Sequence, residues 1–144
     1  MSVRENIAGN IVTTLKDMRE PVKAAYVTRE PFDFEKLSNA QYPAVLVQTT
    51  GESRADSTIG DTGINREGTI TYQIVAYVKS KEIDTARNEI IEAIEEALDT
   101  DRTRGGYAKD TQVTSVETDE GSIDPIGGVL LTVEVQYFYT RGAA

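Results

Sequence analysis

The residues best suited to chemistry in this sequence are carboxylates, because its 144 residues include no His and no Cys. Disulfides, thiolate nucleophiles, imidazole bases and the usual zinc ligands are therefore excluded. Any chemistry has to use carboxylates, hydroxyls, Lys or Arg. The chain contains no glycine-rich phosphate loop, no nucleotide-binding fingerprint and no nucleophile–base motif.

One tripeptide, Asp61-Thr62-Gly63, matches the motif of aspartic proteases, in which two carboxylates share one proton. That chemistry needs the aspartate at a turn held between hydrophobic strands, whereas residues 57–65 are the most polar part of the chain. We interpret the tripeptide as part of a solvated loop. An enzyme built on Asp61 is the alternative; it predicts inactivation by Asp61→Asn and dimers with Asp61 on the two-fold axis.

A second pattern imitates the oxygen-ligand spacing of a calcium loop: Asp99, Asp101 and Thr103, with Asp110 at the twelfth position. The position that needs Gly for a sharp turn is Arg104, and the last position is Asp rather than the bidentate Glu. Turn chemistry and helix-terminal charge explain these residues better. The carboxylates between residues 117 and 124 have no ligand spacing and predict a solvated edge. We expect no metal and no cofactor.

The element that must position everything else is the stretch 68–99. Apolar side chains occupy every second position from Ile70 to Val78, which predicts a strand. From Ile83 the apolar period changes to that of a helix, and the remaining positions are mostly Glu. A short link joins the two elements, so the helix must fold back onto the sheet.

The other elements follow from similar patterns. Ser2 and Glu5 have the form of a capping box, which predicts a helix that begins there and stops at Pro21. Residues 33–42 are polar and predict an irregular connection. The remaining predicted strands are 22–29, 44–50, 111–119 with a bulge between Val113 and Val116, and 129–139.

This order, α-β-β-β-α-β-β, predicts an α+β fold: one domain, residues 1–144, with a mainly antiparallel five-stranded sheet and two helices on one face. The second faces of the two long strands carry four sizeable apolar side chains. In a chain with only two helices, another copy is the simplest cover for that face. These side chains are Val75, Tyr77, Leu130 and Phe138.

The connection 51–67 predicts a long hairpin arm. It has three glycines, alternating charges and few apolar groups. Such an arm gains little burial by itself, so a partner surface is expected to order it. Arg54 and Arg66 are candidates for ion pairs between subunits. The full set of candidate interface residues is Arg54, Asp56, Ile59, Asp61, Ile64 and Arg66 in the arm, with Tyr77 and Phe138 on the strands.

The charge of the chain argues against a nucleic-acid grip. Fifteen basic residues against 24 acidic ones give a formal net charge of −9, and the Lys and Arg residues are scattered. No window approaches the roughly 18 apolar residues of a membrane span, and no secretion signal opens the sequence. A cytoplasm-like compartment without membrane contact is the expectation.

Several segments together carry a family resemblance: the amphipathic N-terminal helix, PAVLVQTT at 43–50, the charged arm, VAYVKS at 75–80, DTARNEIIEAIEEAL at 84–98 and VLLTVEVQYFYT at 129–140. In this order they resemble the tail terminator, or tail completion, proteins of long-tailed bacteriophages. The resemblance spans nearly the whole chain and rests on no invariant motif.

The resemblance implies a small α+β subunit of a hexameric ring that caps the tail tube, ends its polymerisation and joins tail to head. The implied partners are copies of itself, the tail tube protein and neck or connector proteins. DNA would pass through the lumen without specific binding. The implied location is the virion, after assembly in the host cytoplasm.

Two other functions stay open from the sequence. The first is another neck, connector or tube protein of the same kind of particle. The second belongs to a different class, a cytoplasmic oligomeric ligand-binding module that uses the sheet face. It predicts a concave apolar pocket with convergent polar groups.

Overall fold

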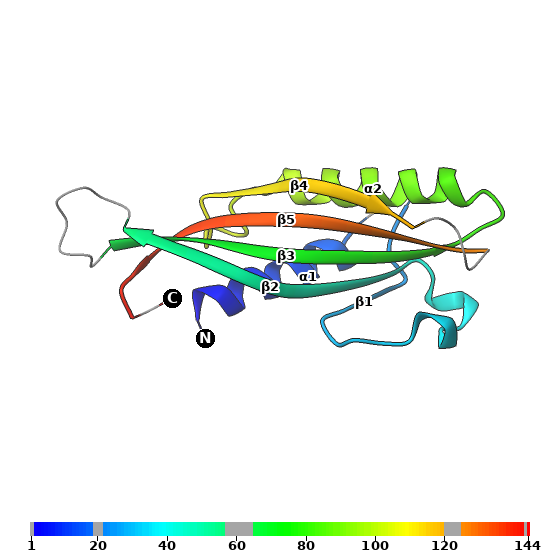
Figure 1. Ribbon diagram of the computed structural model, residues 1–144, viewed down its shortest axis with the longest axis horizontal. Coiled ribbons are helices and arrows are strands. Elements are labelled where there is room, and N and C mark those ends of the chain that lie inside the picture. Colours follow the sequence, from blue (N-terminus) through cyan, green and yellow to red (C-terminus); the bar gives the residue numbers. More distant parts are fainter. Residues whose placement is uncertain (1, 19–21, 57–64, 120–124, 143) are drawn as a thin grey trace.

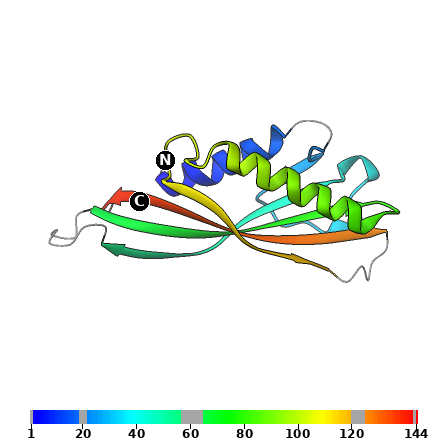
Figure 2. The same ribbon diagram turned by 90° about the horizontal axis from the view of Figure 1, so that it is seen from above.

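The computed structural model describes residues 2–18, 22–56, 65–119, 125–142 and 144, which form an elongated sheet with both helices on one face (Figures 1 and 2). An α+β fold is therefore confirmed in outline. Along the chain the elements are α1 (Val3–Lys16), β1 (Tyr26–Thr28), the 3-10 helices η1 (Phe34–Lys36) and η2 (Asn39–Gln41), β2 (Ala44–Asp56), β3 (Asn65–Lys79), α2 (Ile83–Thr100), β4 (Asp110–Thr118) and β5 (Ile126–Thr140).

The sheet is mixed. Its strand order is β1-β2-β3-β5-β4, and every neighbouring pair is antiparallel except β1 and β2, which run parallel. The first strand is also much shorter than the predicted 22–29. The connection 29–43 allows the parallel pairing, because it contains η1 and η2 and is long enough to return the chain to the same end of the sheet.

The first helix begins as expected and ends earlier. Ser2 Oγ accepts a hydrogen bond from the backbone N–H of Glu5 at 3.1 Å. The reciprocal half of the capping box is absent, because the Glu5 carboxylate instead accepts two hydrogen bonds from Arg29, at 2.5 and 3.2 Å. The helix ends at Lys16, before Pro21.

The core lies between the helices and one sheet face. Each helix contributes a stripe of buried aliphatic side chains, and β3 and β5 contribute every second residue, as the alternation predicts. The stripes are Ile7, Ile11 and Leu15 from α1, and Ile90, Ile94 and Leu98 from α2. The strand residues include Ile70, Tyr72, Ile74, Ala76 and Val78 of β3, and Val129, Leu131, Val133, Val135 and Tyr137 of β5.

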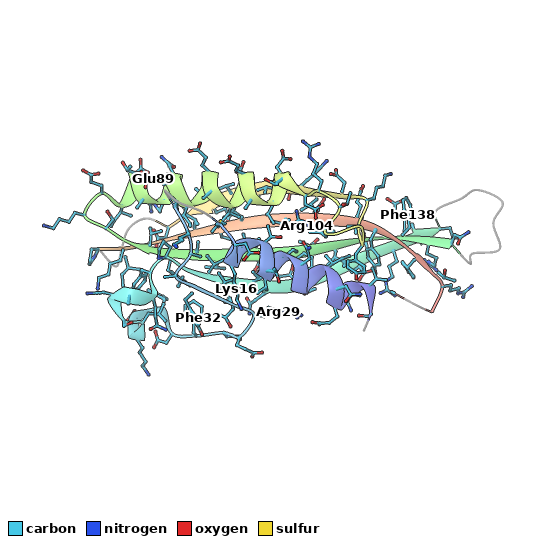
Figure 3. All side chains as sticks on the ribbon, turned by 180° about the vertical axis from the view of Figure 1, so that it is seen from behind. Lys16, Arg29, Phe32, Glu89, Arg104 and Phe138 are labelled. Atoms are coloured by element: carbon cyan, nitrogen blue, oxygen red, sulfur yellow. The ribbon has the colours of Figure 1, made fainter. Side chains whose placement is uncertain are left out.

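The sheet face opposite the helices, called here the open face, is covered at one end by the chain itself. Phe34 stacks on Tyr77 with ring centroids 4.4 Å apart, and Phe32 contacts both Tyr77 and Tyr26. Figure 3 shows Phe32 in this connection, at the opposite end of the molecule from Phe138. The chain itself therefore covers part of Tyr77, for which another copy was expected to be the simplest cover. Farther along, the face carries mainly Thr, Gln and Glu.

Two further strand predictions can be compared with the structure. The bulge in β4 is confirmed, since the register with β5 shifts between Val113 and Ser115. The hairpin arm is more regular than predicted: β2 runs to Asp56 and β3 starts at Asn65, with paired residues along both flanks. Residues 57–64, at the centre of the predicted arm, lie outside the described residues.

Candidate functional site

The feature that sets this sheet apart is a three-stranded ribbon, defined here as residues 51–56 of β2, 65–69 of β3 and 136–140 of β5. Backbone pairing holds these segments in register, with Asp56 opposite Arg66 and Glu67 opposite Phe138. Figures 1 and 2 show the hairpin of β2 and β3 extending past the ends of both helices. The described residues nearest its far end, Ala55, Asp56 and Asn65, are exposed.

A buried carboxylate anchors the base of the ribbon on the helix side. The Glu52 side chain is 7% exposed and contacts donors from three elements. It lies 2.8 Å from Arg4 Nε in α1 and 2.6 Å from Arg54 Nε in β2, and it accepts a hydrogen bond from the Tyr137 hydroxyl of β5 at 2.7 Å. This Glu52 cluster ties the first helix to the hairpin.

A glycine on the strand between them makes the cluster possible. A Cβ atom at Gly68 would lie 2.5 Å from Tyr137 Cε1 and 2.6 Å from Glu52 Oε2, too close for either to keep its place. Arg54 also lies over the ring of Tyr139, 4.9 Å from its centroid, and the Tyr139 ring stacks on that of Tyr137. The glycine is an isolated one within a strand, which is the sequence signal for a close approach.

The electrostatics of the cluster favour the ionised carboxylate. Burial raises the pKa of Glu52, but the hydrogen bonds from Arg54 and Tyr137, with the charges of Arg54 and Arg4, outweigh it and hold that pKa below its usual value. Burial and the hydrogen bond to Glu52 raise the pKa of Tyr137. A carboxylate so fully engaged with donors is a structural anchor rather than a base.

The opposite face of the ribbon carries an exposed aromatic side chain. Phe138 is 53% exposed, and the Lys109 ammonium lies 5.3 Å from the centroid of its ring. Its cross-strand neighbour is Glu67, whose own neighbour on β2 is the small residue Ala55. An exposed ring among small and charged side chains is typical of an interface anchor.

The structure brings some of the sequence-predicted interface residues together and separates others. Arg54, Asp56, Arg66 and Phe138 all lie in the ribbon. Arg54 pairs with Glu52, and Arg66 Nε lies 3.8 Å from Asp56 Oδ1, so both arginines already have partners in their own chain. Tyr77 lies near the other end of β3, opposite Ala44 and Gly128, and its ring stacks on that of Phe34. The other three candidates, Ile59, Asp61 and Ile64, lie outside the described residues.

The calcium-like spacing has a local explanation. Asp101 accepts hydrogen bonds from the N–H groups of Thr103 and Gly105, at 3.1 and 2.7 Å, and Asp99 pairs with Arg102 at 2.7 Å. Arg104 is fully buried and donates to the carbonyls of Leu98 and Asp101 at the end of α2. Within the described ranges, no group of three or more acidic side chains is arranged to hold a metal ion.

Two hollows lie on the helix side of the sheet. The first, about 410 Å³, lies between α2 and the connection after η2, and its lining includes Tyr42, Val78, Lys79 and Ile90. The second, about 700 Å³, lies between α2 and β4. Across the part of the chain that the structure describes, no helix combines the length and apolarity needed to cross a bilayer.

Comparison with known proteins gives no family assignment. No family model matches the chain, and no curated protein matches it. Among solved structures, the chain is similar to one described as "Virion of native gene transfer agent (GTA) particle", with 10% sequence identity and a TM-score of 0.42. That match covers 96% of this chain and 92% of the other. A similarity of this size does not establish a shared fold.

Proposed function

We propose that this chain is a structural subunit of a phage-like virion, of the tail terminator kind: it caps the tail tube as a ring, ends tube polymerisation and joins the tail to the head or neck. The observation that carries the proposal is the ribbon, which extends past the helices and presents Phe138 to solvent. An ordered projection with an exposed aromatic side chain is suited to contacting another protein.

The base of the ribbon supports the same role. A projecting hairpin can hold a bound partner at a fixed place relative to the rest of the subunit only if its base is rigid. The Glu52 cluster supplies that rigidity, because it connects β2 and β5 to the first turn of α1 through contacts of 2.6 to 2.8 Å. The ribbon is therefore a fixed extension of the sheet at its base.

The acidity of the chain suits a protein that lets DNA pass. Each copy carries a formal charge of −9, so a ring of six copies would be strongly negative and would repel the phosphate groups of DNA. We propose that the ring is a hexamer, that it contacts the tube protein and neck proteins, and that DNA moves through its lumen without specific contacts.

A non-enzymatic role is part of the proposal. The buried carboxylate of Glu52 is held ionised by two arginines and a tyrosine, which leaves it poorly suited to accept or donate a proton near neutral pH. The same geometry is also compatible with another neck, connector or tube protein, since a projecting ribbon suits any of these assembly positions.

The direct test is genetic. The gene is deleted from the genome that encodes it, and the particles are examined by electron microscopy. The expected result is tails of irregular length that are not joined to heads, with both defects restored by supplying the gene in trans. Normal joined particles would exclude the terminator role, whereas joined tails of irregular length would favour a tube component.

A further inference from the structure

We infer that the groove between α2 and β4 is a docking site for a basic, extended segment of another protein, which adds as a strand to the open edge of β4. β4 is an edge strand of the sheet and pairs only with β5 among the described strands. Figure 1 shows α2 lying along this strand. An unpaired strand edge presents backbone donors and acceptors to any extended chain that can approach it.

The groove has the size and floor of a peptide site. It encloses about 700 Å³, with a floor of Leu98, Thr111 and Val113. The bulge after Val113 interrupts the register of β4, so the regular half of the edge, residues 110–113, is the half that lines the groove. Strand addition is thus confined to this short stretch, where one wall is the helix.

The walls of the groove select a basic occupant. Glu92, Glu95, Glu96 and Asp99 lie on one stripe of α2, at spacings of three and four residues, and all four are exposed. Arg102 is the single basic residue in the lining, and it is engaged with Asp99. The three glutamates have no ion-pair partner among the residues that the structure describes. The groove therefore offers uncompensated negative charge beside a strand edge.

The spacing of these carboxylates fits a strand. Alternate side chains of an extended segment are about 6.8 Å apart, and successive turns of α2 are about 5.4 Å apart. Lys or Arg at every second position, facing the helix, can therefore each reach a carboxylate of the stripe. The same charges disfavour pairing between the β4 edges of two copies, because they would bring two acidic stripes together. The site thus discriminates a basic partner from a second copy of this chain.

The experiment uses the full chain and a synthetic peptide, acetyl-Lys-Thr-Lys-Val-Lys-Thr-Lys-amide, in an NMR titration at low ionic strength. We expect shifts and slowed amide exchange at residues 110–113 and along 92–99. The triple variant Glu92→Gln, Glu95→Gln, Glu96→Gln should weaken binding by about tenfold, since it removes three exposed charge pairs. The matched control, Glu30→Gln, Glu35→Gln, Glu82→Gln, removes the same charge elsewhere and should change binding less than about twofold.

Two further outcomes bear on the strand geometry. A peptide with N-methyl groups at alternate backbone positions keeps its charge but loses strand hydrogen bonds, so it should bind much more weakly. The proposal is overturned if the plain peptide does not bind, if the shifts lie elsewhere, if both triple variants weaken binding equally, or if the methylated peptide binds as well. This inference does not depend on the virion role.

Discussion

Glu52 fixes the base of the ribbon relative to α1 and the rest of the sheet. Its carboxylate is the meeting point of α1, β2 and β5, and Gly68 of β3 leaves the space that it occupies. A buried charge is tolerated only when oppositely charged or hydrogen-bonding groups surround it. Loss of the Glu52 charge would therefore leave Arg4 and Arg54 without their counter-ion.

Glu52→Gln tests this at the level of one residue. The amide keeps the shape but loses its attraction for Arg4 and Arg54, so we expect the free energy of unfolding to fall by about 1–3 kcal/mol. Chemical denaturation followed by circular dichroism measures the change. The control is Glu134→Gln on the open face, where the side chain is exposed and the change should stay within ~0.5 kcal/mol. Equal effects of the two substitutions would mean that the cluster adds no stability.

The same carboxylate predicts a pH dependence. Because the folded-state pKa of Glu52 lies below its ordinary value of 4.5, its contribution is complete above that pH and is lost as the pH falls through the lowered pKa. The pKa values of Glu5 and Asp101 are lowered too, so the wild type should lose stability on going from pH 7 to pH 3. Glu52→Gln should lose less over that range. An identical loss in both proteins would contradict the assignment.

A substitution at Phe138 tests the proposed interface with little effect on stability. Its ring is 53% exposed, so Phe138→Ala should change the free energy of unfolding by less than about 0.5 kcal/mol. If the ring is an interface anchor, the same variant should reduce the yield of joined particles when it replaces the wild-type gene product. The matched substitution is Val116→Ala on β4, another exposed apolar side chain but far from the ribbon. Normal yield with Phe138→Ala would remove this residue from the interface.

Among the helices and strands, the sequence predicted correctly those whose apolar residues recur at a regular spacing. The alternation of β3 and β5 and the stripes of both helices were read correctly, because each buries one face against a common core. β1 was predicted too long, because its pairing with β2 covers only Tyr26 to Thr28 and the chain bends on both sides of it. The predicted strand ended at residue 50 and the predicted arm began at residue 51, because Ser53, Arg54 and Glu67 show no apolar alternation, although their backbones pair.

The candidate site was predicted less completely than the fold. Its charged residues could be named from the arm, but the contact between Glu52 and Tyr137 joins residues 85 positions apart, and no local pattern reports such a contact. The cover of Tyr77 by Phe34 was missed for a related reason. Residues 33–42 were interpreted as a polar, irregular connection, and only the path of residues 29–43 over the sheet places Phe32 and Phe34 on the open face.

Two glycines give a matched pair for testing how closely the strands approach. Gly68→Ala places a methyl group against Tyr137 and Glu52, so β3 must shift, at a cost of about 1–3 kcal/mol. Gly51→Ala, on the neighbouring strand, meets no atom within 4 Å and should change stability little. Thermal denaturation of the two variants compares them directly. A Gly68→Ala protein as stable as Gly51→Ala would mean that the cluster is looser than its distances indicate.

The whole molecule is an elongated body with chemically distinct regions. One end of the open face is covered by the connection 29–43, the other end is the ribbon, and α2 adds an acidic wall along the β4 edge. This division is what an assembling subunit needs, because each neighbour can engage a different surface without competition. A ring of copies and a projecting ribbon are the two parts of the proposed function.

We propose that the ribbon makes, at its hairpin end, the contact that joins the tail to the head. The most direct measurement replaces residues 57–65 with Asn-Gly, a short hairpin turn that leaves the pair Asp56–Arg66 and the Glu52 cluster in place. We expect a protein with unchanged thermal stability that fails to restore joined particles in the deletion strain. Restoration of joined particles at the wild-type yield would contradict the account.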